Sequence, residues 1–418
     1  MNSIYYNKYL KYKSKYLQLK NQVGGADIDN SSIQTIKLIV QFINLSNHKS
    51  SKYKCIIEEK LSKIIGEKIV IDSNGTSTSY TITKFLGKGG FGCVFKIIND
   101  TNSQFYVIKL GVTIKREEIN EAIILKELMN NIIPNCNYSA ISYGSKNIES
   151  NTIYFIIFNF KGDNDLFKIL VISKNLQFIP KYIREILTCL IEINKKGYHG
   201  DLKTENIVID EHNAASIIDY GFAKTYASIK LVFPIDLQDS DTFHLGIVQT
   251  SIDILIAHKM VKENKIGIFN ELYAYVLDKI LHTIDNFGLF WLIINCFYMN
   301  LFREIITKEF YTDYIYIGTE KEIITKYIEL YFNLNPPKTN FEISIFTEIG
   351  IKIDALFREN FIKSIKQKLI NDGKLELIFS NEENYTSFMN LLLELIRVDP
   401  FERKTFIDLL QHRIFNKQ

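Results

Sequence analysis

The 418-residue sequence is poor in proline and cysteine, and it carries little net charge. Only six prolines occur and apolar residues make up 46% of the chain, which excludes a linker-rich or disordered protein. The five cysteines are odd in number and include no Cys-x-x-Cys pair, so we expect a reduced, intracellular protein without a zinc site. The N-terminus lacks the apolar segment of a signal peptide, so we do not expect secretion.

Long apolar runs are also missing. The most apolar stretch, residues 287–302, contains two asparagines and is about sixteen residues long, whereas a membrane span needs roughly 20 apolar residues. We therefore expect no transmembrane segment, and we interpret this stretch as a buried core helix.

The formal charge of +3 is unevenly distributed. The first 25 residues contain five lysines and no acidic residue, so the rest of the chain carries a formal charge of −2. A near-neutral body argues against a dedicated nucleic-acid-binding protein. Within residues 1–25 tyrosines recur at helical spacing, which predicts a basic aromatic helix. This helix could dock on its own domain or be a solvated tail, or it could serve in partner docking, in targeting or at a membrane surface.

The order of strand and helix patterns predicts an α+β protein. We treat residues 26–79 as an N-terminal extension, with helical patterns near 33–45 and 55–65 and a strand pattern at 67–72. From residue 80 to about 160 strand patterns dominate, and from about 165 helical patterns dominate. A small β-rich lobe should therefore precede a large, mainly helical lobe.

A glycine-rich loop lies between two strand patterns in KFLGKGGFGCVFK, residues 84–96. Glycines let backbone N–H groups approach phosphate oxygens closely. A dinucleotide-binding fold would continue into a helix here, whereas the residues after Gly92 are β-branched and aromatic. This context favours a lid over a nucleotide, although an ordinary hairpin is the plainer alternative. The residues expected to contact the nucleotide are Gly87, Lys88, Gly89, Gly90, Phe91, Gly92 and Val94.

Lys109 ends the apolar strand pattern FYVIKL, residues 105–110. An inward-facing ammonium is costly to bury unless an anion receives it, and phosphate oxygens or a carboxylate would do so. Glu121, on an amphipathic helical pattern at residues 115–129, is the carboxylate that we favour over its solvated neighbours. A surface ion pair on that helix remains the alternative.

Polar residues cluster after two later apolar segments, in YHGDLKTENIVID (198–210) and SIIDYGFAK (216–224). Phosphoryl transfer requires metal ligands, charge neutralisation and an oriented hydroxyl group. Asn206 and Asp219 offer hard oxygen ligands suited to Mg²⁺. Asp201 would orient the substrate hydroxyl group and Lys203 would neutralise the transferring phosphoryl group.

Together these segments resemble the signature set of eukaryotic-type protein kinases. GKGGFGCV resembles the glycine-rich loop, VIK the lysine strand, HGDLKTEN the catalytic loop and DYG the metal-binding motif. The central helix of the family resembles IDNFGLFWLIINCFY (284–298), where Asp285 would brace the catalytic loop. The closing segment of the family resembles DPFERKTFIDLLQHRIF (399–415), where Arg403 stands at the position of the kinase arginine. The resemblance covers roughly residues 80–416.

The resemblance implies a bilobal fold that binds ATP and Mg²⁺, with an N-lobe at about 80–162 and a C-lobe at about 163–416. It places a gatekeeper at Phe158 and adenine contacts at Asn159, Phe160 and Lys161. Lys203 resembles the serine/threonine branch of the family. His199 is expected to have a structural role, packing beneath Tyr220.

Two departures from the family pattern keep other interpretations open. Gly200 replaces an arginine that binds a phosphorylated activation loop in many kinases, so we expect activity without that phosphorylation. The same glycine is found in small-molecule phosphotransferases of the aminoglycoside and choline kinase type. No Ala-Pro-Glu follows in the long segment 222–284, so the protein substrate is not identifiable and a pseudokinase that acts as a scaffold is a further alternative.

The N-terminal helix is similar to segments that open many proteins of mimivirus-type giant DNA viruses. That likeness suggests a viral kinase in the host cytoplasm or the virion. The likeness says nothing about the mechanism of the protein.

Overall fold

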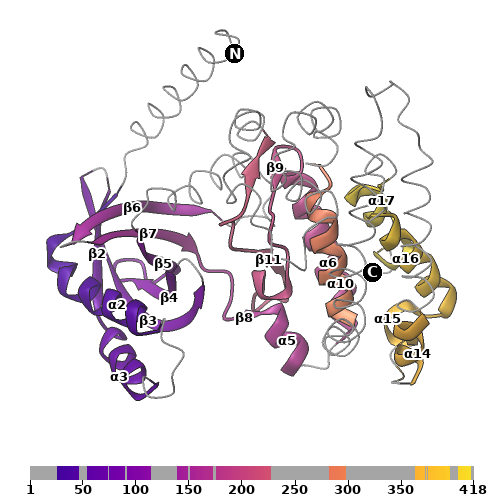
Figure 1. Cartoon of the computed structure of the whole chain (residues 1–418), viewed down its shortest axis with the longest axis horizontal. Coiled ribbons are helices and arrows are strands. Elements are labelled where there is room, and N and C mark those ends of the chain that lie inside the picture. Colours follow the sequence, from indigo (N-terminus) through magenta and orange to yellow (C-terminus); the bar gives the residue numbers. More distant parts are fainter. Residues whose placement is uncertain are drawn as a thin grey trace, which may run out of the picture. The chain divides into compact units, whose positions relative to one another are not determined.

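The computed structural model divides the chain into two compact units (Figure 1). The first unit comprises residues 1–130 and 138–163, and the second comprises residues 131–137 and 164–418. The structure describes residues 26–46, 54–73, 75–89, 92–113, 139–148, 151–172, 176–226, 282–297, 363–371, 373, 375–395 and 403–415. The expected helices at 1–25 and 115–129, and residues 227–281, lie outside the described part.

The first unit is built on a seven-stranded antiparallel sheet with the order β1-β2-β3-β4-β5-β7-β6. Its strands are β1 (Asp27–Ile28), β2 (Lys68–Ser73), β3 (Thr76–Gly89), β4 (Gly92–Asn99), β5 (Phe105–Thr113), β6 (Ala140–Ile148) and β7 (Asn151–Asn159). The backbone N–H of Ala26 donates to the carbonyl oxygen of Tyr143 at 3.0 Å, and Ala26 forms a parallel bridge with Gly144. The residue preceding β1 therefore joins the opposite edge of the sheet, so the sheet curls back on itself.

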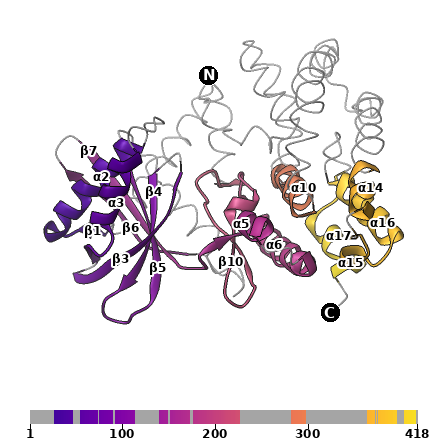
Figure 2. The ribbon, with the colours of Figure 1, turned by 90° about the horizontal axis from the view of Figure 1, so that it is seen from below.

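The N-terminal extension supplies part of the core of this unit. Helix α2 (Ile33–Ser46) carries apolar residues at helical spacing, and it packs on one face of the sheet with α3 (Lys54–Ile64) beside it (Figure 2). The ring of Phe42 on α2 meets that of Phe85 edge-on, with 5.3 Å between centroids, and it also contacts Phe95 on β4. Full burial of one such ring contributes about 1.5–3 kcal/mol. Residues 26–73 thus belong to the same packed unit as the strands that follow, which the sequence patterns do not indicate.

Alternation along β4 assigns the two faces of the sheet. Cys93, Phe95 and Ile97 are buried on the face that packs against α2, whereas Val94 lies on the other face. Lys109 on β5 pairs directly with Val94 across the strands, so it lies on that second face as well. The thiol of Cys93 is buried in this core.

The second unit contains short strands and most of the described helices. A three-stranded sheet has the order β11-β10-β8, and β12 pairs with β9. Its strands are β8 (Asn164–Asp165), β9 (Gly197–Tyr198), β10 (Ile207–Ile209), β11 (Ala215–Ile217) and β12 (Lys224–Thr225). Its helices are α5 (Leu166–Ile172), α6 (Ile179–Ile193), α10 (Ile284–Phe297), α14 (Lys363–Asn371), α15 (Leu375–Phe379), α16 (Glu382–Glu394) and α17 (Phe406–Leu410), with 3-10 turns η5 (Leu176–Phe178), η6 (Thr204–Asn206) and η11 (Arg413–Phe415).

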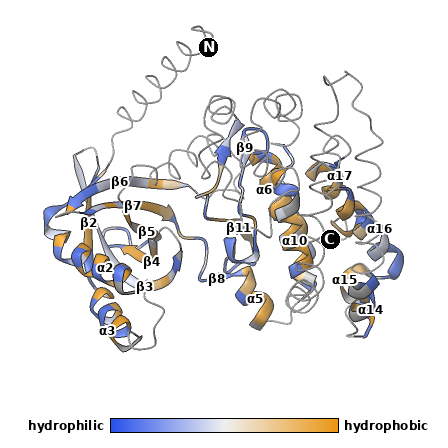
Figure 3. Cartoon of the chain, viewed as in Figure 1, coloured by the Kyte–Doolittle hydropathy of each residue, from blue (hydrophilic) through white to orange (hydrophobic). Residues whose placement is uncertain are grey.

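Helix α10 is apolar over most of its length (Figure 3). Leu289, Phe290 and Ile293 are fully buried, which confirms the prediction of a core helix for residues 287–297, while residues 298–302 lie outside the described part. Within the described residues, no helix combines the length and the apolar character that a bilayer crossing demands.

Candidate functional site

The first unit presents the glycine-rich segment as the tip of the β3–β4 hairpin. Gly87 pairs with Val94, and Gly89 pairs with Gly92, so the loop joins two antiparallel strands as expected. A Cβ added at Gly92 would clash with the carbonyl oxygen of Leu110 on β5, so only glycine fits where the hairpin returns to the sheet. Gly90 and Phe91, at the tip itself, lie outside the described residues.

Lys109 stands in the middle of the sheet, paired with Val94 on one side and with Ile156 on β7 on the other. Lys109 is buried, with 8% of its surface exposed, as expected for a lysine whose ammonium group binds an anion. The proposed partner, Glu121, falls outside the described residues, so the pairing stays a prediction.

The segment expected to contact adenine follows β7. Phe158 is buried, and Asn159 is fixed by a hydrogen bond from its Nδ2 to the Ser139 hydroxyl group at 3.1 Å. Phe160 and Lys161 continue the chain in partly buried positions. The adenine contacts of these three residues remain a prediction.

In the second unit, Asp285 holds the catalytic-loop segment in place. Its two carboxylate oxygens accept the backbone N–H groups of His199, at 2.7 Å, and of Gly200, at 2.8 Å. Gly200 has φ +81°, a conformation that glycine adopts without cost and other residues adopt with strain. Burial raises the pKa of the Asp285 carboxyl group, while the two N–H donors and the nearby imidazole oppose that rise.

The helix that carries Asp285 approaches the loop closely at a second point. A Cβ added at Gly288 would lie 2.9 Å from the Cβ of Leu202, closer than real Cβ contacts. Glycine at this position lets α10 pack directly under the loop.

The carboxylate of Asp201 is the centre of a small hydrogen-bond network. Lys203 Nζ lies 2.5 Å from its Oδ2, and Asn206 Nδ2 donates to the same oxygen at 2.9 Å. Asn206 Nδ2 also donates to the backbone carbonyl oxygen of Asp201 at 2.8 Å. Within the part of the chain that the structure describes, the second carboxylate oxygen, Oδ1, has no hydrogen-bond partner. Asp201 is only 3% exposed, so this oxygen sits on a fixed, buried side chain.

The imidazole of His199 has a supporting position. Its Nδ1 accepts the backbone N–H of Asp201 at 3.2 Å, and its Nε2 donates to the carbonyl oxygen of Ile218 at 3.0 Å. Its ring contacts that of Tyr220 edge-on, with 4.7 Å between centroids. Both nitrogens are therefore engaged in holding the loop against the segment around Asp219, which fits the structural role expected for this residue.

Asn206 and Asp219 are brought to the same end of the β10–β11 hairpin. Ile207 pairs with Ile217, and the N–H of Ile218 donates to the carbonyl oxygen of Asn206 at 2.9 Å. Asp219 follows directly, with φ +61°, a strained conformation that Asp and Asn tolerate best among non-glycine residues.

These two side chains fit a magnesium ion better than a transition metal. Since Asn206 uses its amide nitrogen on Asp201, its amide oxygen is the atom left for a cation, and Asp219 would offer a carboxylate from the same end of the hairpin. Among the described residues no cluster of three or more His, Cys, Asp or Glu side chains forms a complete metal cage. A two-oxygen site completed by phosphate and water is the arrangement that Mg²⁺ favours.

The closing segment is tied to the base of α10. Arg403 is buried, and its Nη1 donates to the hydroxyl group of Thr283 at 2.9 Å, just before α10 begins. The side-chain amide of Asn286 donates to the carbonyl oxygens of Leu395, at 2.9 Å, and Lys404, at 3.3 Å. Arg403 therefore supports the same helix that supplies Asp285.

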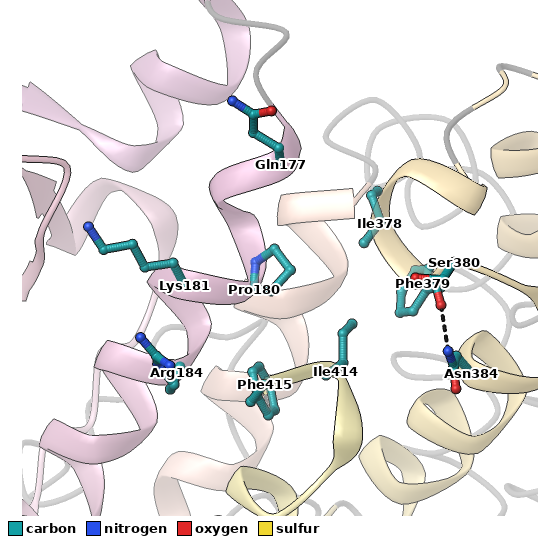
Figure 4. Close-up of a pocket in the computed structure, with 10 residues that line it drawn as sticks. All are labelled: Gln177, Pro180, Lys181, Arg184, Ile378, Phe379, Ser380, Asn384, Ile414 and Phe415. Carbon is teal, nitrogen blue, oxygen red and sulfur yellow. Dashed lines mark hydrogen bonds between the residues drawn. The ribbon is translucent and has the colours of Figure 1, made fainter. Parts of the chain in front are cut away.

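A pocket of about 190 Å³ lies in the second unit (Figure 4). It lies between the start of α6, the α15–α16 connection and η11, and it includes none of the predicted site residues. Lys181 at its rim donates to the backbone carbonyl oxygen of His212 at 3.4 Å. The side-chain amide of Asn384 donates to the backbone carbonyl oxygen of Phe379 at 2.8 Å. These two polar side chains are thus engaged in internal contacts.

Comparisons with known proteins agree with this geometry. Residues 80–234 match the family model for the protein kinase domain. A probable serine/threonine-protein kinase of fowlpox virus is 28% identical over 159 residues, which cover 35% of this chain and 54% of that relative. A probable serine/threonine-protein kinase of Dictyostelium discoideum is 28% identical over 169 residues, which cover 37% of this chain and 35% of the relative.

The chain thus spans about half of the length of the first relative and about a third of the second. The matched segment runs from the start of the glycine-rich hairpin past Asp219, so it contains every residue predicted to contact the nucleotide, the metal or the substrate, but not Asp285 or Arg403. The matches show that residues 80–234 are similar to the protein kinase domain, and both relatives are named as probable serine/threonine-protein kinases.

Proposed function

We propose that this protein transfers the γ-phosphate of ATP, in the presence of Mg²⁺, to serine or threonine residues of protein substrates. The observation that carries the proposal is the Asp201 carboxylate, buried and fixed at one oxygen by Lys203 and Asn206, with its other oxygen without a hydrogen-bond partner in the described residues. A catalytic carboxylate needs this combination of a fixed position and an oxygen left for the substrate.

In the proposed reaction the oxygen of a substrate hydroxyl group attacks the γ-phosphorus, and the bond between that phosphorus and the β–γ bridging oxygen breaks. Asp201 Oδ1 orients the hydroxyl group and receives its proton, and ADP departs with the bridging oxygen. Lys203, 2.5 Å from Asp201 Oδ2, is close enough to neutralise the transferring phosphoryl group as well. In the first unit, Lys109 would bind phosphate oxygens and the β3–β4 hairpin would cover them.

Asn206 and Asp219 would hold Mg²⁺, which neutralises charge on the phosphates. Their positions at one end of the β10–β11 hairpin support this assignment, since a shared local element fixes the spacing of the two oxygen donors. Asp285 would act through the backbone, because it fixes the loop on which Asp201 stands.

The proposal includes a bilobal kinase fold, with an N-lobe at about residues 80–162 and a C-lobe at about 163–416. The extension at 26–79 would then add a helical layer and strands to the N-lobe, and residues 1–25 would form a helix for docking a partner. We further propose an intracellular protein that does not bind nucleic acid, and an origin in a giant DNA virus, which rests on the resemblance of residues 1–25 alone.

The experiment that tests the function is transfer of radiolabel from [γ-³²P]ATP with Mg²⁺ to basic and acidic generic proteins and to the protein itself. Asp201→Asn is the inactive variant, and Glu211→Gln is the matched control, because Glu211 is an exposed carboxylate outside the catalytic-loop segment. We expect phosphoserine or phosphothreonine with wild type and Glu211→Gln, and none with Asp201→Asn.

Two other results would overturn the proposal. Nucleotide binding without transfer to any protein or metabolite would identify a pseudokinase. Transfer to an aminoglycoside, choline or a related small alcohol in place of protein would identify a small-molecule phosphotransferase.

A further inference from the structure

Two lysines face each other across the strands of the nucleotide-binding hairpin. Lys84 on β3 pairs directly with Lys96 on β4, and register shifts lie on both sides of Lys84. Like charges in direct cross-strand positions destabilise a sheet unless a counter-charge joins them. We call Lys84 and Lys96 the lysine pair.

A single carboxylate joins the lysine pair. Asp163 Oδ1 lies 3.0 Å from Lys84 Nζ, and Asp163 Oδ2 lies 2.9 Å from Lys96 Nζ. Burial raises the pKa of the Asp163 carboxyl group, but the two ammonium groups more than offset this, so its pKa lies below the ordinary value. The carboxylate is therefore ionised at neutral pH.

Lys96 is held more firmly than a surface lysine. Its Nζ lies 4.0 Å from the centroid of the Phe160 ring and 4.3 Å from that of Phe105, and its side chain is only 13% exposed. Cation–π contacts of this kind gain strength when the ammonium group is partly desolvated. The charge on Lys96 is thus fixed in position, unlike that of most surface ion pairs.

Asp163 and the lysine pair lie next to the segments proposed to bind ATP. Lys84 stands three residues before Gly87, and Lys96 stands two residues after Val94 on the same face of β4. Asp163 is the last residue of the first unit, two residues after the segment 159–161 that should contact adenine. Within this unit, the contacts tie the base of the phosphate-covering hairpin to the adenine-binding segment.

We propose that Asp163 is a positioning residue that binds the lysine pair and so holds the glycine-rich hairpin at the correct distance from the adenine-binding segment. This inference rests on the proposed function. Asp163 belongs neither to the residues proposed to contact the nucleotide nor to the catalytic residues. Its proposed effect is on the affinity for ATP. Loss of the carboxylate frees the hairpin and restores repulsion between the two lysines, so ATP binding weakens while the groups that perform the transfer stay in place.

The test measures binding of a fluorescent methylanthraniloyl derivative of ATP, and steady-state kinetics, for wild type and Asp163→Asn. At about 20 mM KCl we expect a rise of about fivefold in the dissociation constant and in KM for ATP, with kcat changed by less than about twofold. The rise should shrink at about 300 mM KCl, because salt screens the wild-type pairs. Asp163→Glu, which keeps the charge, should recover part of the affinity.

Two further variants separate positioning from general stability. Lys96→Gln should weaken binding less than Asp163→Asn does, because it leaves the Asp163–Lys84 pair and removes one of the two like charges. The double variant should be no weaker than Asp163→Asn, because both single variants remove the same Asp163–Lys96 pair. Asp27→Asn is the matched control, since it removes an ion pair of 3.0 Å with Lys146 in the same sheet but away from the hairpin. It should leave ATP affinity unchanged.

The outcomes distinguish this inference from the proposed function. Equal ATP affinity for wild type and Asp163→Asn at low salt, in a protein that transfers phosphate, would overturn the positioning role and leave the kinase assignment standing. An equal loss of affinity in Asp27→Asn would also overturn it, because the effect would then be one of general stability. A wild-type protein that binds no ATP would overturn both.

Discussion

The carboxylate of Asp285 accepts the backbone N–H of Gly200 at 2.8 Å, although the two residues are 85 positions apart in the sequence. The neighbouring N–H of His199 donates to the other carboxylate oxygen at 2.7 Å, and both partners are buried. A helix that is apolar almost throughout thus contributes one charged group, and that group fixes the backbone of the loop that carries Asp201. The conformation of the loop that carries Asp201 therefore depends on a buried residue of the core helix α10.

Asp285→Asn is the variant that isolates this role. It keeps the side-chain volume but replaces one acceptor oxygen with an NH₂ group facing an N–H donor, so it costs about 1.5–3 kcal/mol of charge-assisted hydrogen bonding. We expect kcat to fall at least about tenfold, with a smaller change in the dissociation constant of ATP. Steady-state kinetics and nucleotide binding would measure the two effects. Glu376→Gln, at an exposed acidic residue of α15, is the control, and retention of full kcat in Asp285→Asn would refute the bracing role.

The backbone conformation of Asp219 makes it possible to replace this proposed metal ligand without adding strain. Its φ of +61° suits Asn nearly as well as Asp, so Asp219→Asn removes the charge without adding strain. We expect phosphate transfer to fall below detection at every Mg²⁺ concentration, with the thermal unfolding midpoint unchanged. Asp219→Ala should also be inactive but less stable, because alanine adopts this conformation at a cost of about 1–2 kcal/mol. Mg²⁺-dependent transfer by Asp219→Asn at the wild-type rate would rule out the assignment.

The local elements around the site could be predicted from the sequence because each one carries its own signal. The strand patterns on both sides of Gly87–Val94 predict the β3–β4 hairpin, and the apolar run at 287–302 predicts a buried helix. The motif spacing predicts that Asp201, Asn206 and Asp219 act together. In the structure Asn206 contacts Asp201, and Asn206 and Asp219 flank the same end of the β10–β11 hairpin, while their catalytic and metal-binding roles stay predictions.

The contacts that depend on long-range packing could not be predicted in the same way. No pattern in residues 26–73 indicates that Ala26 meets Tyr143, or that Phe42 packs on Phe85, because both contacts join segments that are far apart in the sequence. The partner of Arg403 was also unidentifiable from sequence, and the Thr283 hydroxyl group that it contacts has no recognisable motif. Asp163 was missed since an aspartate after a predicted strand usually marks a turn.

Gly200 supports a prediction about regulation. With φ +81° and no side chain, it cannot bind a phosphate on the activation segment, so we expect phosphatase treatment to leave activity within about twofold of the untreated protein. Gly200→Arg should lower the thermal unfolding midpoint and the activity, because a left-handed conformation costs a side chain about 1–2 kcal/mol. Gly200→Ala separates backbone strain from the added charge. Loss of most activity after dephosphorylation would show that another residue performs the arginine's role.

His412 should make the stability of the second unit depend on pH. Burial, and then the charge of Arg413, lower the pKa of its imidazole below the ordinary value of about 6.5. The neutral ring is bound at both nitrogens: Nε2 donates to the Ser387 hydroxyl group at 3.1 Å, and Nδ1 accepts the N–H of Ile414 at 3.3 Å. The unfolded chain therefore binds more protons than the folded one below about pH 6.5, so the free energy of unfolding falls as pH drops through that region.

The measurement is the thermal unfolding midpoint at about pH 7.5 and about pH 5.5 for wild type and His412→Gln. Both proteins lose stability from other groups at the lower pH, but wild type should lose more, because glutamine has no proton to bind. His212→Gln, at an exposed histidine of the same unit, should behave as wild type does. If wild type and His412→Gln lose the same amount, then His412 does not titrate differently in the folded and unfolded states, and the hydrogen bonds to Ser387 and Ile414 do not require a neutral ring.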